Sequence, residues 1–134
     1  MASDIDKPLV SVIVPVYNVG MFALPCVNSL LDQTYSNIEY IIVDDGCTDN
    51  TIDLIEDAVG SDTRFKILHK ENGGLSSARN FGTQRCHGDY VMYVDGDDLI
   101  DSRTVELMVE AADKYQVPLV IAPLRRRLSL ITIR

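Results

Sequence analysis

The sequence predicts an α/β domain in which helices cover both faces of a mainly parallel β-sheet, a three-layer α/β/α arrangement. Short apolar runs rich in β-branched residues alternate along the chain with segments of helical spacing. This alternation is typical of parallel strands joined by right-handed helical crossovers. Polar clusters directly follow several of the apolar runs. Because ligands bind outside the carboxyl ends of such strands, these clusters mark the expected site.

The first part of the chain predicts a strand, a helix and a second strand. Leu9–Val14 is almost wholly apolar, as in a strand buried on both faces, and Pro15 is expected to end it. Apolar residues at helical spacing run from Pro25 to Gln33, and a proline suits the first turn of a helix. Ile38–Val43 is the expected second strand.

The next elements follow the same order. Thr48 or Asp49 can cap a helix that carries Ile52 and Ile55, and Phe65–Leu68 is the expected third strand. A further helix is expected to begin after the two glycines of "ENGGLSSARN".

The last elements are a strand, a helix and a strand. Tyr90–Val94 is the expected fourth strand, and Asp101 or Ser102 can cap the helix after it. Leu119–Ala122 is the expected fifth strand.

Residues 7–123 are expected to form one domain, because 134 residues with 46% hydrophobic content can build one core. Residues 124–134 differ in character: a basic run, Arg125–Arg127, precedes apolar residues without clean periodicity. The sequence leaves open whether this segment starts a further strand, is a disordered tail or is a cloning remnant.

Charge and cysteine content exclude some functions. The net charge of −8 argues against a nucleic-acid surface, but a nucleotide held through a metal ion is compatible with it. Cys26, Cys47 and Cys86 match no zinc or disulfide spacing and are expected to be reduced. No apolar run is long enough to span a membrane and the N-terminus lacks signal-peptide features, so the expected compartment is the cytoplasm.

Three aspartates follow the fourth strand in "YVMYVDGDDLI". Asp95, Asp97 and Asp98 repel one another unless a cation compensates their charge. Mg²⁺ and Mn²⁺ prefer oxygen ligands and often complete their shell with water and substrate phosphates. Gly96 lets the backbone turn between two acids. A solvated turn with a helix cap is the alternative, but the position after a buried strand favours a metal site formed by Asp95 and Asp97.

Other polar residues belong to the same predicted edge. Asp44 and Asp45 end the second strand and can accept hydrogen bonds from a base N–H or from ribose hydroxyls, or can simply form a turn that caps the next helix. Arg79 can pair with Asp45 or with a phosphate. Gly73 and Gly74 can bring backbone N–H groups close to an anion, a weak signal. The two histidines, His69 and His87, are expected to be exposed or strand-end residues.

Long stretches of the chain resemble the family 2 glycosyltransferases: "VSVIVPVYNV", "SLLDQTYSNIEYIIVDDGCTDNT", "ENGGLSSARNFG" and "GDYVMYVDGDDL" appear in the order and spacing of that family. The resemblance covers roughly Lys7–Pro123. It implies a Rossmann-like fold of GT-A type and an inverting transferase. The donor would be a nucleotide sugar, usually a UDP-sugar, and the acceptor a saccharide or a lipid-linked molecule. Polysaccharide or glycoconjugate synthesis in the cytoplasm, or at the cytoplasmic face of the membrane, would be its setting.

The resemblance also implies residue roles at the nucleotide. Pro15, Val16 and Tyr17 would lie against the base and ribose. Asp45 would bond the base, usually uracil, with Asp44 beside it.

On the phosphate side, the resemblance implies that Arg79 helps to hold Asp45 or the diphosphate. Asp95 and Asp97 match the D-x-D motif, with Asp95 near the ribose and Asp97 as the main ligand of a Mn²⁺ or Mg²⁺ ion that bridges the diphosphate. The ion would neutralise charge on the leaving nucleotide.

Two departures from the family pattern stand out. Cys47 occupies a position where the family usually has Ser. The family's catalytic base is an Asp or Glu well beyond the D-x-D motif, so it is expected beyond Arg134, and the chain is expected to be the nucleotide-binding half of a transferase. The alternative is a donor-binding module without turnover. A phosphoacceptor signalling domain is disfavoured, because it would place its acidic pair after the first strand and a lysine near the last.

Overall fold

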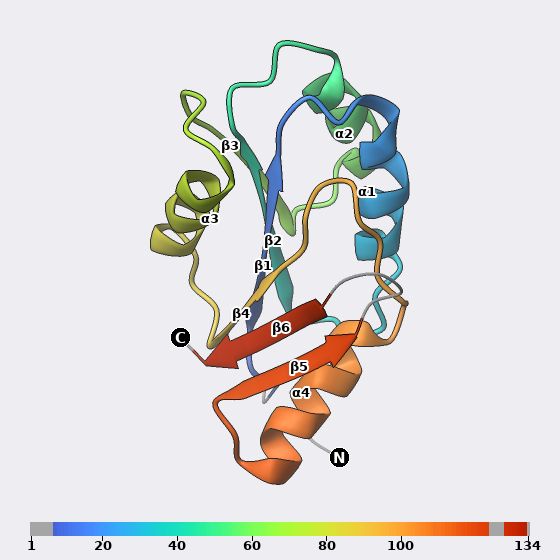
Figure 1. Cartoon of the computed structure of the whole chain (residues 1–134). Helices are drawn as coiled ribbons and strands as arrows, with labels where there is room; N and C mark the ends of the chain where they lie inside the picture. Colours follow the sequence, from blue (N-terminus) through green and yellow to red (C-terminus); the bar gives the residue numbers. More distant parts are fainter. Residues whose placement is uncertain (1–6, 124–127, 134) are drawn as a thin grey trace.

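A computed structural model describes residues 7–123 and 128–133 (Figure 1). One sheet contains six strands in the order β3-β2-β1-β4-β6-β5. The strands are β1 (Val10–Val16), β2 (Ile38–Asp44), β3 (Phe65–His69), β4 (Tyr90–Tyr93), β5 (Leu119–Pro123) and β6 (Leu128–Ile133). Strands β1 to β4 are mutually parallel, and β6 runs antiparallel to both β4 and β5. The mainly parallel sheet expected from the sequence is therefore confirmed.

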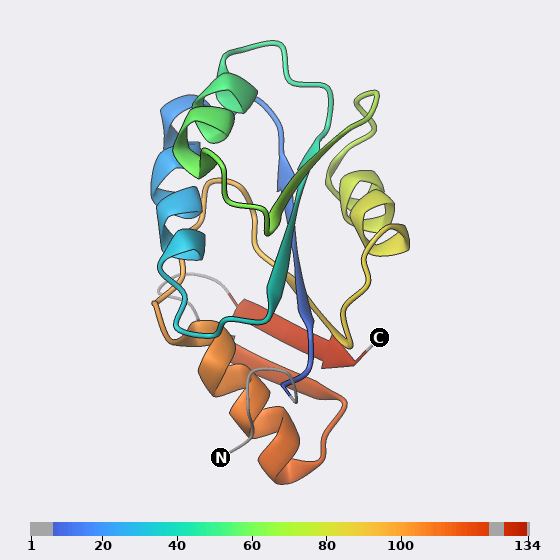
Figure 2. The same ribbon diagram turned by 180° about the vertical axis from the view of Figure 1, so that it is seen from behind.

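Helices cover both faces of the parallel strands, which confirms the three-layer arrangement (Figures 1 and 2). The helical elements are the 3₁₀ helix η1 (Gly20–Phe22), α1 (Ala23–Leu31), α2 (Thr51–Val59), α3 (Leu75–Gln84) and α4 (Thr104–Tyr115). Helices α1 and α2 lie on one face and α3 on the other. Helix α4 packs near β5.

Alternate strand residues enter two separate cores. Val12 and Val14 of β1 belong to the larger core on the α1 and α2 side. Ile13 belongs to a smaller core that contains Ala78 of α3. The same alternation continues past the strand ends, because successive side chains of a strand point to opposite faces. It directs Asp45 and Asp95 to the α3 side of the sheet.

Pro15 does not end the first strand, contrary to expectation. It lies within β1 and pairs in register with Val43 of β2. The ladder between β1 and β4 has already ended at Ile13, and the Pro15 carbonyl accepts a hydrogen bond from Gly96. A proline is tolerated here because no ladder bond on that side requires its missing N–H.

Helix starts also differ in detail from expectation. Helix α1 begins two residues before Pro25, which does lie in its first turn. Before α2, Asp49 accepts the backbone N–H of Thr51, while Thr48 bonds to Asn18 instead. Asp101 accepts the N–H of Arg103 just before α4, but the N-cap of α4 is Arg103, without a side-chain cap bond, so neither Asp101 nor Ser102 is the N-cap residue as expected.

The C-terminal segment forms a strand where its backbone is described. Residues 128–133 form β6, inserted in the sheet between β4 and β5. The basic run at 125–127 lies outside the described residues. In the described ranges, no helix has the length and apolar character needed to cross a bilayer.

Candidate functional site

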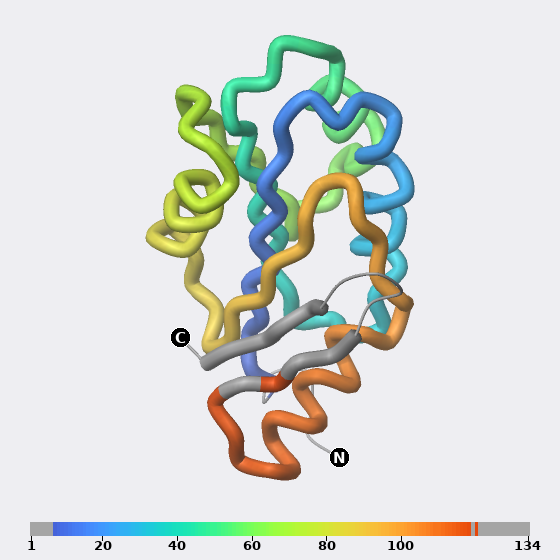
Figure 3. Tube along the Cα trace, viewed as in Figure 1, coloured from blue at the N-terminus to red at the C-terminus, as the bar shows by residue number. Residues whose placement is uncertain are grey.

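The loop after β4 packs directly on the end of β1 (Figure 3). The Gly96 N–H donates to the Pro15 carbonyl over 3.1 Å. A Cβ atom at position 96 would lie 2.4 Å from Val16 Cγ1, too close for any side chain. Glycine is therefore required where the acidic turn meets the "PVY" segment, and the two motifs form one site.

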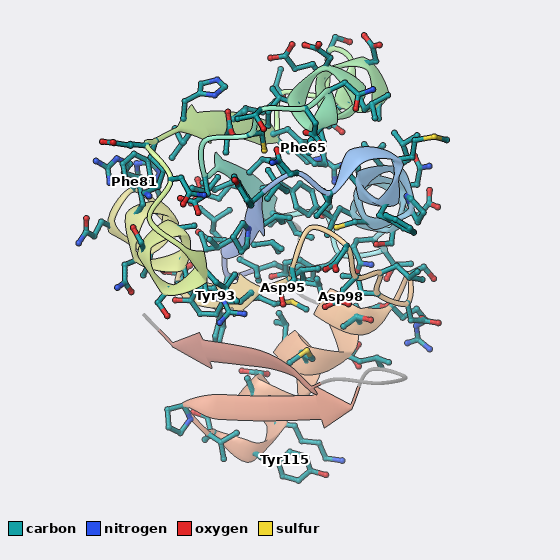
Figure 4. All side chains as sticks on the ribbon, turned by 45° about the horizontal axis from the view of Figure 1, so that its top comes forward. Phe65, Phe81, Tyr93, Asp95, Asp98 and Tyr115 are labelled. Carbon is teal, nitrogen blue, oxygen red and sulfur yellow. The ribbon has the colours of Figure 1, made fainter. Side chains whose placement is uncertain are left out.

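Acidic side chains gather on this turn, between α3 and α1 (Figure 4). The buried Cys26 thiol lies beneath them, 3.6 Å from the Asp95 carbonyl. Burial raises the pKa of Cys26 to about 12, and the charges of Asp98, Asp97 and Asp95 add to this increase. The Cys26 thiol thus lies within the electrostatic reach of all three carboxylates.

The carboxylates differ in what they contact. Asp95 Oδ1 accepts a hydrogen bond from Arg79 Nη2 at 2.9 Å. Asp97 is exposed and forms no hydrogen bond or ion pair within residues 7–123 and 128–133. In those same ranges, no three His, Cys, Asp or Glu side chains are arranged to hold a metal by themselves. Carboxylate oxygens such as those of Asp97 are ligands that hard cations such as Mg²⁺ and Mn²⁺ prefer.

Arg79 on α3 faces the end of β4. Its guanidinium carbon lies 6.0 Å from the Tyr93 ring centre, and its side chain is 37% exposed. Its Nε atom is buried and has no hydrogen-bond partner among the residues that the structure describes. Arg79 pairs with Asp95. Of the two partners expected for Arg79, the Asp45 carboxylate pairs with Lys70 instead, and a phosphate stays the other expected partner.

Asp45 is the most enclosed acid of the site, with its side chain only 4% exposed. Its oxygens accept hydrogen bonds from Lys70 Nζ at 2.8 Å and from the N–H groups of Gly73 and Gly74 at 3.0 Å. Asn72 Nδ2 lies 3.4 Å from Oδ2. Burial favours the neutral acid, but the bonds from Lys70, Gly73 and Gly74 outweigh it and lower the pKa of Asp45. The anion to which the two glycine N–H groups donate is thus the Asp45 carboxylate of the protein itself.

Asp44 is held less completely than its neighbour. It accepts the N–H of Cys47 at 2.8 Å and contacts His69 Nδ1 at 2.8 Å. Its side chain is 13% exposed. Burial acts to raise the pKa of Asp44, but the hydrogen bonds from Cys47 and His69 outweigh it and the pKa is lowered. A carboxylate has about four acceptor positions, so Asp44 retains capacity for a further donor.

The "PVY" segment presents one exposed ring to this edge. Pro15 and Val16 are buried, whereas Tyr17 is 49% exposed. The next residue, Asn18, adopts a positive φ of 49° and accepts the Thr48 N–H at 2.8 Å. Asn18 therefore ties the loop after β1 to the loop after β2 and fixes the position of Tyr17.

Sequence reasoning did not identify Lys70 and Asn18 as site residues. Lys70 follows β3, which pairs with β2 immediately beside Asp45, so a basic residue after one strand and an acid after its neighbour was an available signal. His69 is exposed at a strand end as expected, but it also pairs with Asp44. The three cysteines are separate thiols.

Comparison with known proteins supplies the family. The profile for glycosyl transferase family 2 matches residues 11–129. The chain belongs to glycosyl transferase family 2. Among family members, the uncharacterized glycosyltransferase EpsJ of Bacillus subtilis is 46% identical over 113 residues, which cover 84% of this chain and 33% of that protein. Glycosyltransferase GlyG of Streptococcus pneumoniae is 40% identical over 114 residues, which cover 84% of this chain and 38% of that protein.

Solved structures share the GT-A fold with this family 2 chain. S. aureus TarS 1-349 in complex with UDP-GlcNAc has a TM-score of 0.77 and 30% identity, over 83% of this chain and 33% of that one. A mannosyltransferase from Pyrobaculum calidifontis, in complex with GDP-Man and Mn²⁺, has a TM-score of 0.83 over 97% of this chain and 46% of that one. At 19% identity, it shows the fold alone. The chain spans 33% and 38% of the two curated relatives named above.

Proposed function

We propose that this chain is the donor-binding part of a glycosyltransferase that moves a sugar from a UDP-sugar to an acceptor. The observation that carries the proposal is the Arg79–Asp95 pair beside the exposed Asp97, at the carboxyl ends of the parallel strands. The Arg79 guanidinium can donate hydrogen bonds to a diphosphate, and the Asp97 carboxylate can bind the metal ion that accompanies it. TarS, at 30% identity, was solved with UDP-GlcNAc.

The base and ribose are proposed to lie over the ends of β1 and β2. Tyr17 offers an exposed ring there, and Pro15 and Val16 form the strand end beneath it. Asp44, which keeps acceptor capacity, is proposed to receive a donor from the nucleotide. The Asp45 carboxylate already has four donors within 3.4 Å. We therefore propose that Asp45 holds the surrounding loops in place, in contrast to the bond to the base that the resemblance implies for it.

A Mn²⁺ or Mg²⁺ ion is proposed to be held by Asp97 and Asp95. When bound, such an ion neutralises charge on the departing diphosphate. Arg79 can donate to the same diphosphate. Asp95, which already pairs with Arg79, orients that guanidinium.

The reaction is proposed to be an inverting transfer in polysaccharide or glycoconjugate synthesis. An acceptor hydroxyl oxygen attacks the anomeric carbon while the bond to UDP breaks, and a general base takes the hydroxyl proton. The base and the acceptor wall are proposed to lie beyond Arg134, as the resemblance implies; the segment shared with this chain makes up 33% and 38% of the two relatives named above. One relative at 39% identity over 103 residues is a chondroitin synthase of Pasteurella multocida.

Calorimetry with different nucleotides tests the donor assignment. The 134-residue chain is titrated with UDP, GDP and ADP in the presence of Mn²⁺. UDP is expected to bind with 1:1 stoichiometry and at least about tenfold more tightly than the purine nucleotides, the effect of one well-placed hydrogen bond to a charged group. Equal affinity for the three would overturn the UDP assignment, and no binding of any would overturn the donor site itself.

A further inference from the structure

Lys70 is an enclosed lysine to which the proposed function gives no role. It follows β3, and only 12% of its side chain is exposed. Its Nζ atom donates to Asp45 Oδ1 at 2.8 Å and to the Glu71 carbonyl at 2.5 Å. Lysines are almost never enclosed in this way unless they are paired, and an enclosed ion pair is weak evidence for stability. A role other than stability is therefore worth seeking for this pair.

The segment from Lys70 to Gly74 folds around the Asp45 carboxylate. Gly73 and Gly74 donate their backbone N–H groups to it. On the adjacent turn, a Cβ atom at Gly46 would lie 2.9 Å from the Asn72 nitrogen, so the two loops are in close contact. Asp45 thus gathers a lysine and two backbone donors from one short segment.

This segment leads directly into the helix that carries Arg79. Gly74 adopts a φ of +93° at the N-cap of α3, and its carbonyl accepts the first helical bond, from Ala78. Further along α3, a Cβ atom at Gly82 would lie 2.6 Å from Ile13 Cγ2, so the helix is pressed against the sheet. Because α3 is fixed at both of these points, the position of the Arg79 side chain is fixed as well, and its guanidinium donates a hydrogen bond to Asp95.

We propose that Lys70 is a positioning residue for the diphosphate of the donor. Its ion pair with Asp45 fixes the segment from Lys70 to Gly74 and the start of α3, and through them it aims Arg79 at the phosphates. Lys70 acts through Arg79 and has no contact of its own with the nucleotide. This role rests on the proposed function, since it concerns the same donor site.

The proposal predicts an effect confined to the phosphates. Uridine lacks the groups that Arg79 would contact, whereas UDP has them. A Lys70 variant that misplaces Arg79 therefore loses affinity for UDP and keeps its affinity for uridine. A variant that merely loosens the fold loses both. The ratio of the two affinities separates positioning from general destabilisation.

The test uses amide NMR titrations of the 134-residue chain with UDP and with uridine, both in Mg²⁺. Lys70→Met is expected to weaken UDP binding at least about tenfold, the effect of one lost hydrogen bond to a charged group, and to change uridine affinity by less than about twofold. Lys70→Arg keeps the charge and is expected to retain most of the UDP affinity. Lys66→Met removes an exposed lysine from β3, the strand that precedes Lys70, and should change neither affinity.

A second variant covers the event that Lys70→Met does not fold. Lys70→Met combined with Asp45→Asn removes both charges together, so neither is left unpaired, and it is expected to show the same selective loss of UDP affinity. Equal losses for UDP and uridine, or UDP affinity unchanged in either variant, would overturn the positioning role. Failure of the unaltered chain to bind UDP would overturn the proposed function, and this role with it.

Discussion

Arg79 Nη2 lies 2.9 Å from Asp95 Oδ1, and this contact joins α3 to the end of β4 across the candidate site. The pair is partly exposed, so it contributes little to stability. Its significance is positional, because it holds a guanidinium beside two acids, and within the described part of the chain the Nε atom has no hydrogen-bond partner. Such an arrangement is suited to receive an anion together with a cation.

Replacing Arg79 by lysine tests the guanidinium directly. Lysine keeps the positive charge but lacks the planar fork and the Nε donor. We expect Arg79→Lys to weaken UDP binding by about tenfold or more, while the thermal midpoint changes little. Calorimetry of this variant is compared with Arg85→Lys, which alters an exposed arginine just after the same helix. UDP affinity that is equal in both variants would show that Arg79 does not contact the phosphates.

Replacing Asp97 by asparagine tests the metal ligand. The change keeps the shape of the side chain and removes one charge. We expect Asp97→Asn to weaken Mn²⁺-dependent UDP binding by about 1.5–3 kcal/mol, the range for a hydrogen bond to a charged group. The ligand-free chain should be as stable as before or more stable, because repulsion among the acids falls. Asp57→Asn, an exposed acid on α2, is the matched control, and affinity equal to that control would refute the metal role.

Acid stability tests the enclosure of Asp45. Hydrogen bonds lower its folded-state pKa below the ordinary 3.8, so its contribution to stability is complete above that value and is lost as the pH falls through the lowered pKa. Urea midpoints of the unaltered chain should therefore fall steeply in acid. Asp45→Asn should start lower at neutral pH, because Lys70 loses its partner, and should decline less in acid. Parallel curves for the two proteins would contradict this account.

Much of the fold follows from local patterns that the sequence displays. Mainly apolar runs such as Ile38–Val43 predict buried parallel strands, and the structure places β2 there with one residue added. The helix after the two glycines appears as α3. The acids after β2 and β4 lie together at one edge because parallel strands end together, so the site could be located before its geometry was known.

The pairings within the site could not be predicted in the same way. Arg79 pairs with Asp95 because the packing of α3 against the sheet decides which acid it reaches. Lys70 pairs with Asp45 because β3 lies beside β2, a pairing between strands distant in sequence. Pro15 stays in β1 because the pairing of β1 with β4 has already ended at Ile13, so no ladder bond needs the N–H that proline lacks. This depends on tertiary structure and overrides the expectation that a proline ends a strand. The insertion of β6 between β4 and β5 likewise depends on pairing between segments distant in sequence.

The most direct test of the account is where Mn²⁺ acts when UDP is bound. Mn²⁺ broadens the amide signals of nearby residues, so NMR of the 134-residue chain with UDP and substoichiometric Mn²⁺ locates the ion. The account predicts selective broadening at the loop after β4 around Asp97, with weaker effects at Tyr17 and Arg79. Signals near Glu39 and His87, which pair with each other away from the candidate site, should be unaffected. Broadening centred on another part of the chain, or the same pattern without UDP as with it, would contradict a metal ion shared between this acidic turn and a bound diphosphate.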